Sequence, residues 1–125
     1  MITARRIVLW FAAILIVHVV AVYLDLYDRI PNIDIPMHFL GGGAVSLISI
    51  YLTKNSKFKT WQYLIFVLGF TIIVGIGWEY FEFAVDQIFE DKFGWNRMTL
   101  RDTLGDLLYD GLGATIFWVV YKDRI

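Results

Sequence analysis

The residues of this chain that could do chemistry are seven carboxylates at helical spacing, beside or inside strongly apolar stretches. They are Asp34, Glu79, Glu82, Asp86, Asp102, Asp106 and Asp110. A charged side chain is costly in hydrocarbon, so carboxylates in such positions usually serve binding, proton transfer or catalysis. The sequence therefore predicts an acidic functional site within apolar surroundings.

Helical geometry predicts that these carboxylates meet. At about 100° per residue, the three acidic residues of segment 79–86 fall within roughly 60° of arc, and those of segment 102–110 within roughly 80°. Each set therefore forms one stripe. His38, four residues after Asp34, adds an imidazole at the same depth. Gly113 lies under the second stripe, where a small residue permits close helix approach.

The cluster supports two kinds of chemistry. Carboxylate oxygens with one imidazole suit a divalent ion such as Mg, Mn, Ca, Zn or Fe. The expected metal ligands are His38, Glu79, Glu82, Asp106 and Asp110, of which Glu79, Glu82 and Asp106 are also the expected catalytic acid or base groups. Without a metal, crowded carboxylates would keep protons between them, as suits a proton or cation relay.

Some of the charged residues have a plain structural alternative. Asp34 and Asp102 fit helix N-termini equally well, and Asp86 is expected in water beyond the hydrocarbon. Arg97 and Arg101 are candidate substrate-binding residues, since guanidinium groups bind phosphate or carboxylate, although pairing with local Asp is an equal alternative.

Composition assigns the chain to the integral membrane proteins. Its 125 residues are 58% hydrophobic and 18% aromatic, and its mean hydropathy is +0.62, more than a soluble domain of this size can bury. The absence of cysteine excludes disulfides, thiolate metal sites and thiol catalysis. No basic groove suggests a nucleic-acid partner, so the expected partner is the lipid bilayer.

Apolar runs predict an all-α, polytopic fold with four transmembrane helices in a single membrane domain, 1–125. The expected spans are approximately 7–24, 36–52, 61–89 and 102–121. The uncharged parts of the last two runs are shorter than the roughly 20 residues that cross a bilayer. Their carboxylates are therefore expected inside the crossing.

The distribution of Lys and Arg predicts the orientation. Seven of the 11 basic residues fall at the N-terminus, the connection 53–60 and the C-terminus, and four fall in the other connections. Because the side richer in Lys and Arg is normally cytoplasmic, both termini are expected in the cytoplasm. Every carboxylate of the two stripes then lies toward the outer face.

Three short segments resemble known families. The stretches 34–42, 78–82 and 102–106, with Asp110 and Gly113, resemble the YjdF-like small prokaryotic membrane proteins and, more broadly, VanZ-like proteins, which are linked with resistance to glycopeptide antibiotics. In the VanZ-like pattern two positions carry amides, whereas this chain has Glu82 and Asp110 there, which makes its site more acidic. The resemblance implies the plasma or inner membrane of a prokaryote.

These observations together predict an outward-facing acidic site that performs metal-dependent chemistry on a lipid-linked or cell-envelope substrate. The alternative is a proton- or cation-coupled transporter or channel subunit, packed against copies of itself as a homo-oligomer, with the same carboxylates as a relay. The apolar residues Ile116, Phe117, Val119 and Val120 below the site favour a one-sided site over a through-pathway.

Overall fold

The computed structural model describes residues 3–89 and 99–123. These residues form helices and short connections, with no strand among them. The helices are α1 (Ala4–Tyr23), α2 (Leu26–Arg29), α3 (Asp34–Thr53), α4 (Thr60–Ile88) and α5 (Leu100–Tyr121). The four long helices begin and end within three residues of the four expected spans. The single-turn helix α2, between α1 and α3, was not expected.

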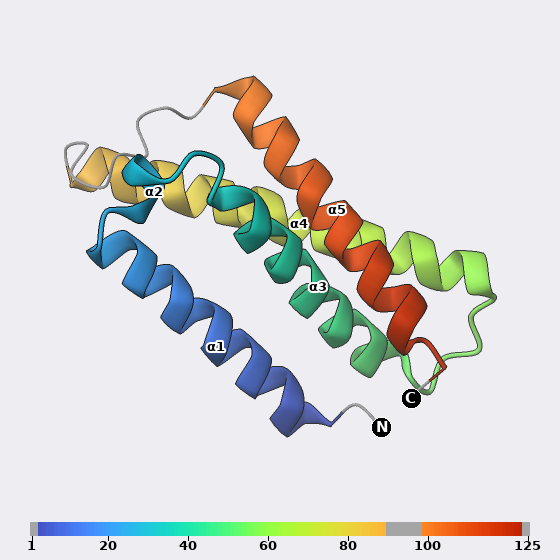
Figure 1. Cartoon of the computed structure of the whole chain (residues 1–125). Helices are drawn as coiled ribbons and strands as arrows, with labels where there is room; N and C mark the ends of the chain where they lie inside the picture. Colours follow the sequence, from blue (N-terminus) through green and yellow to red (C-terminus); the bar gives the residue numbers. More distant parts are fainter. Residues whose placement is uncertain (1–2, 90–98, 124–125) are drawn as a thin grey trace.

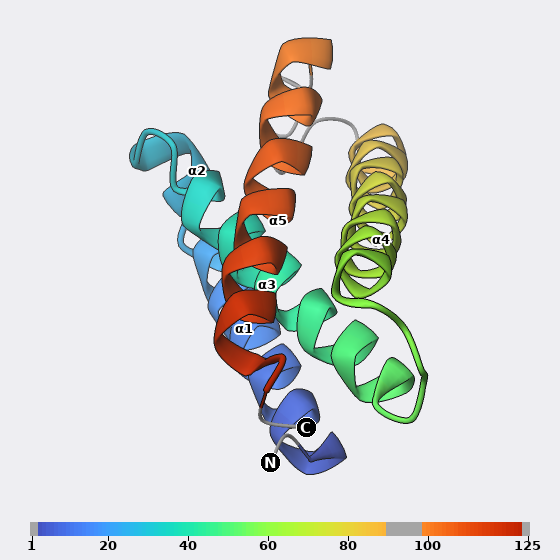
Figure 2. The same ribbon diagram turned by 90° about the vertical axis from the view of Figure 1, so that its right-hand side faces the viewer.

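Helix α3 is the centre of the bundle. It packs along α5 over most of its length and also contacts α1 and α4, and α4 packs against α5 as well (Figure 1). The start of α1 and the ends of α3 and α5 lie at one end of the bundle (Figures 1 and 2). The carboxylate-bearing parts of α3, α4 and α5 lie toward the opposite end, so the fold separates a basic end from an acidic end.

Local hydrogen bonds explain where three helices begin. The Thr3 hydroxyl accepts from the backbone N–H of Arg6 at 3.3 Å at the start of α1, and the Thr99 hydroxyl accepts from that of Asp102 at 3.2 Å at the start of α5. Such side-chain acceptors satisfy backbone donors that have no partner within the helix. Before α4, the backbone N–H of Lys59 donates to the side chain of Gln62 at 2.8 Å.

Burial distinguishes the inner helix from the outer ones. On α3 every residue from Gly42 to Leu47 is buried, whereas on α1 only Ile7 and Ala21 are. The outward side of α1 exposes Val8 (65%) and Ile16 (64%), side chains that a bilayer would cover. At the basic end a small apolar core fills the space between α3, α4 and α5. It consists of Ile50, Val67, Ala114 and Trp118.

Among the described residues, α1, α3 and α4 are long and apolar enough to cross a membrane. Helix α5 has 22 residues, the length of a crossing, but its first half carries Arg101, Asp102, Asp106 and Asp110. Three of the four expected spans therefore meet the standard of length and composition. Whether α5 can be the fourth span depends on whether those charged side chains point into the bundle or toward lipid.

Glycines bring α3 and α5 into close contact. A Cβ atom on Gly113 would collide with the backbone carbonyl of Phe39, and one on Gly42 would collide with the backbone carbonyl of Asp110. Both collisions involve main-chain atoms, which cannot move aside without moving a helix. The predicted role of Gly113 in close helix approach is thus confirmed, and its partner is α3.

We expect Gly113→Ala to destabilise the bundle. The methyl group would push α5 away from α3, and such overpacking typically costs about 1–3 kcal/mol. The measurement is the melting temperature of the purified chain in a maltoside detergent. Gly111→Ala is the matched control on the same helix, because a Cβ atom there meets no atom within 4 Å. Equal melting temperatures for the two variants would contradict the close-contact account.

Candidate functional site

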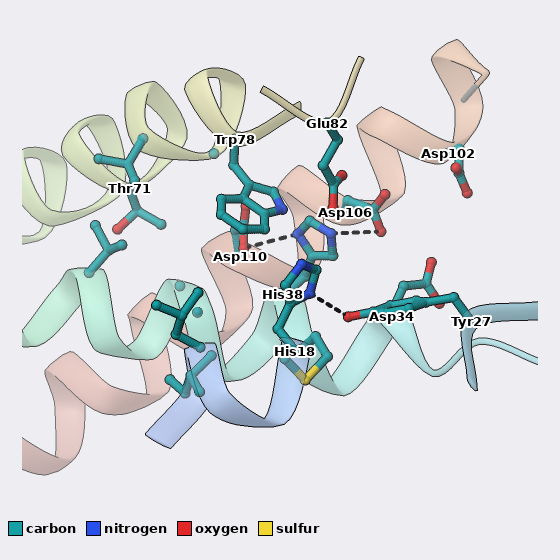
Figure 3. A pocket seen from close by; sticks show the side chains of 18 of the residues that line it. His18, Tyr27, Asp34, His38, Thr71, Trp78, Glu82, Asp102, Asp106 and Asp110 are labelled. Atoms are coloured by element: carbon teal, nitrogen blue, oxygen red, sulfur yellow. Dashed lines mark hydrogen bonds and ion pairs between the residues drawn. The ribbon is translucent and has the colours of Figure 1, made fainter. Parts of the chain in front are cut away.

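His38 lies at the centre of the acidic end, held between carboxylates of two other helices. Its side chain is only 9% exposed. Nδ1 lies 3.4 Å from Oδ1 of Asp110, and Nε2 lies 3.8 Å from Oδ1 of Asp106 (Figure 3). Nε2 also lies 3.9 Å from Oε1 of Glu79. The two ring nitrogens therefore face different carboxylates, Asp110 on one side and Asp106 with Glu79 on the other.

Glu79 presents one satisfied oxygen and one unsatisfied oxygen. The Thr103 hydroxyl donates to Oε2 at 2.9 Å. Oε1 is buried and has no hydrogen-bond partner within residues 3–89 and 99–123, and the residue as a whole is 7% exposed. A buried carboxylate oxygen without a donor is energetically costly, so the site has an unfilled demand for a proton donor or a cation at this atom.

Two groups of three side chains have the spacing of metal ligands. His38, Glu79 and Glu82 offer ligand atoms that all lie within 4.8 Å of one another, and Asp34, Asp102 and Asp106 form a second group with the same property. Only the first group includes an imidazole, and it includes Glu79, the residue with the unsatisfied oxygen. It is therefore the better candidate metal site.

A cavity of about 530 Å³ opens beside these groups and receives side chains from all four long helices and from the α2 region (Figure 3). Six carboxylates line it: Asp28, Asp34, Glu82, Asp102, Asp106 and Asp110. No Lys or Arg is among the described residues of its lining. Crowded anions without a local cation attract positive charge, so the lining favours a metal ion or another cation over a bare anion.

The segment around α2 closes one side of the cavity. The hydroxyl of Tyr27 and Nδ1 of His18 share a hydrogen bond of 2.7 Å, and the His18 ring also meets the Trp78 ring edge to face at 5.2 Å. Burial, together with the negative charges of Glu82 and Asp34, raises the pKa of Tyr27 to about 12. The Tyr27 hydroxyl therefore keeps its proton at neutral pH and remains a hydrogen-bonding group of the wall.

The structure brings together all five residues expected to bind metal. Of these, Glu82 is half-buried, and His38, Glu79, Asp106 and Asp110 are buried. Asp34 and Asp102, for which helix capping was the alternative, also line the cavity. No side-chain capping bond is made at the start of α3, so Asp34 does not serve as its N-cap.

Three further expectations have different outcomes. The placement of Asp86 in water is wrong, because it is only 3% exposed: it lies four residues after Glu82 and continues the buried stripe of α4. Arg101 is exposed and does not line the cavity. Arg97 lies outside the described residues, so its role in substrate binding stays a prediction.

Sequence reasoning missed two polar residues of the site. Thr103 was overlooked because attention fell on ionisable groups, yet it lies about 60° around the helix from Asp106, on the flank of the same stripe. Tyr27 had no comparable signal, because the fold of the connection between α1 and α3 decides which way its side chain points. A search of the stripes for hydroxyl groups would have found Thr103 but not Tyr27.

Comparison with known proteins now identifies the family. A model of the family DUF2238, described as a predicted membrane protein, matches residues 3–124. The chain belongs to the DUF2238 family. This is the YjdF-like family, so that resemblance is confirmed, and this DUF2238 member is a membrane protein. Neither a curated protein nor a solved structure matches the chain.

Proposed function

We propose that this protein binds a divalent metal ion at His38, Glu79 and Glu82 and uses it on a lipid-linked or cell-envelope substrate. The observation that carries the proposal is the Oε1 atom of Glu79. It is buried and lacks a hydrogen-bond partner among the described residues, and Glu79 belongs to a group of three side chains that offer ligand atoms within 4.8 Å of one another. A bound cation would satisfy that oxygen and offset the repulsion between the surrounding carboxylates.

The two faces of the His38 ring support this assignment. Nε2 faces Glu79 and Asp106, while Nδ1 faces Asp110 at 3.4 Å. Metal-bound histidines commonly hold their second ring nitrogen against a carboxylate, which fixes the ring and raises its basicity. Asp110, expected as a ligand, thus fits better as the group that orients His38.

The same arrangement suggests how the groups divide the work. A divalent ion there would lower the pKa of a bound water and polarise an oxygen of the substrate. Asp106, 3.8 Å from Nε2 of His38, is placed to accept or return a proton beside the ion. Ligands built from one imidazole and carboxylates suit Mn, Fe or Zn, and also Mg or Ca when water completes the coordination.

The proposal includes four spans with both termini in the cytoplasm of a prokaryotic plasma membrane. Helix α5 supports a fourth span because its polarity is inverted: Asp106 and Asp110 are buried, whereas Leu104, Leu108 and Leu112 are 57%, 61% and 46% exposed. Intramembrane carboxylates normally face the bundle interior in this way. The basic ends of the helices, gathered at one end of the bundle, support the orientation. The VanZ-like likeness remains part of this proposal.

A specific observation favours the second candidate, a proton or cation relay. The hydroxyls of Ser46 and Thr71 are buried without a hydrogen-bond partner in the described part of the chain, on the parts of α3 and α4 that continue inward from the site. Meanwhile Ile116, Val119 and Val120 are about half exposed and point away from the bundle. These three therefore do not close a path below the carboxylates. Phe117, the fourth residue of the one-sided argument, is half-buried and its ring contacts that of Trp10, so it keeps part of that argument.

For the metal proposal, we expect MnCl₂ to raise the melting temperature of the purified chain after treatment with a chelator. Ligand at a hundredfold excess over its Kd stabilises a folded protein by about 2.7 kcal/mol. Glu79→Gln should lose most of this gain, and Asp25→Asn, which changes an exposed carboxylate outside the cavity, should keep it. Elemental analysis of bound metal gives the second readout. A wild-type chain that neither binds Mn nor melts higher with it contradicts the proposal.

For the topology, the absence of cysteine in the sequence permits single-cysteine labelling. We expect Ile30→Cys, in the connection after α2, to react with an impermeant maleimide in intact cells. Asn55→Cys, in the connection between α3 and α4, should react only after lysis. Both positions are exposed. The reverse pattern would invert the orientation, and labelling of both in intact cells would remove a span.

The relay is tested with the wild-type chain in proteoliposomes under an imposed K⁺ gradient with valinomycin. Because we propose a metal site and not a relay, we expect no proton flux beyond that of empty vesicles. A pH-sensitive dye inside the vesicles reports the flux. Flux that is abolished by both Asp106→Asn and Thr71→Val, but not by Thr115→Val, would favour the relay over the metal site. Thr115 is the matched control because its hydroxyl bonds to its own helix at 2.8 Å.

A further inference from the structure

The cavity beside the carboxylates has two openings of opposite polarity. Asp28, Asn32 and Asp102 line it and are exposed, and they mark an opening at the outer end. Leu15 on α1 and Val74 on α4 also line it and are 55% and 39% exposed. These two mark a second, apolar opening toward the side of the bundle.

The arrangement of α1 explains the side opening. Helix α1 packs against α3 and α2. It meets α4 through the rings of His18 and Trp78, whose centroids lie 5.2 Å apart. One helical turn deeper than this ring pair lie Leu15 and Val74, on opposite walls. The hydrocarbon of a bilayer would surround that level, so the opening faces lipid chains. Asp34 and Asp102, in the first turns of α3 and α5, and Glu82, two turns after Val74, lie nearer the outer end.

The wall of the cavity contains a buried polar atom without a hydrogen-bond partner among the described residues. Thr71 lines the apolar end of the cavity and is 1% exposed, and its Oγ1 has no hydrogen-bond partner among the described residues. A buried hydroxyl in a purely hydrocarbon slot is costly.

Charge narrows the class of occupant further. Six carboxylates and no Lys or Arg line the cavity. A divalent ion alone would still leave six carboxylates facing two positive charges, so a further cationic group is favoured at the outer end. Trp78 and Tyr27 present aromatic rings at the same level, and aromatic faces attract ammonium groups.

We infer that the cavity binds a membrane amphiphile with an ammonium head group, which enters from the bilayer between α1 and α4. The head group lies among Asp34, Asp102 and Glu82, and the hydrocarbon chain lies between Leu15 and Val74. This inference names the substrate class of the proposed function. It rests on the proposed function because it treats the site as one that acts on lipid substrates. Its charge argument, however, holds with or without a metal.

The test compares three probes with the same chain in neutral maltoside micelles: dodecylammonium, dodecanol and dodecyl phosphate. We expect dodecylammonium to raise the melting temperature of the metal-free chain at about a tenfold lower mole fraction than dodecanol, since a charge-assisted contact adds to the same apolar contact. Dodecyl phosphate should have no stabilising effect. Equal effects of the ammonium and alcohol probes, or stabilisation by the phosphate probe, would overturn the head-group assignment.

Matched tryptophan substitutions test the path of the chain. Leu15→Trp fills the side opening, whereas Ile16→Trp points away from it, because Ile16 is 64% exposed and does not line the cavity. We expect Leu15→Trp to weaken dodecylammonium binding by about tenfold and Ile16→Trp to leave it unchanged. Val74→Trp and Ile73→Trp form a second pair on α4 with the same expectation. Equal behaviour within both pairs would overturn the inference.

The outcome for the metal is separable. The four tryptophan variants leave His38, Glu79 and Glu82 in place, so their response to MnCl₂ reports the metal site alone. A wild-type chain that responds to MnCl₂ but is stabilised equally by dodecylammonium and dodecanol overturns this inference only. Normal ammonium binding in a wild-type chain that never responds to Mn overturns the metal proposal only.

Discussion

The close approach of α3 and α5 is the constraint on which the acidic site depends. Gly42 and Gly113 let main-chain atoms of the two helices meet where any side chain would collide. That distance sets how far His38, on α3, reaches toward Asp106 and Asp110, on α5. Larger residues at the two glycines would widen the gap and leave the imidazole and both carboxylates buried without each other, which is the most costly arrangement for polar groups in hydrocarbon.

The inverted polarity of α5 follows from the same constraint. A carboxylate at the centre of a membrane helix costs about 2.5–3.5 kcal/mol by insertion scales when nothing compensates it. Asp106 and Asp110 avoid lipid by facing α3, and leucines cover the outer face of the helix. The proposed fourth span therefore depends on the assembly of α5 with α3 and α4, and this explains why hydropathy and charge alone do not give α5 the composition of a span.

Sequence reasoning predicted the long helices and the meeting of the stripes because both depend on period and composition. Span limits follow from apolar run length, and the convergence of Glu79 with Asp106 follows from the helix repeat. Sequence reasoning failed for residues whose burial depends on packing at a helix end. Asp86 was placed in water because it falls near the end of its span, beyond the expected hydrocarbon, but α4 remains in the bundle at that point and buries it. Tyr27 was missed because a connection, not a periodic helix, directs its side chain.

The electrostatics of the site distinguish it from an ordinary buried ion pair. In such a pair each charge has one partner of opposite sign, whereas here one imidazole lies within 3.9 Å of three carboxylates, and further carboxylates line the cavity beside them. A single positive charge cannot balance that number of anions, so the folded protein must take up protons, a metal ion or a cationic ligand from outside. Within the described residues, the unsatisfied oxygen of Glu79 is one place where such a positive group would be stabilised. The proposed cation beside Glu79 and the proposed ammonium group nearer the outer opening would offset this negative charge at two depths.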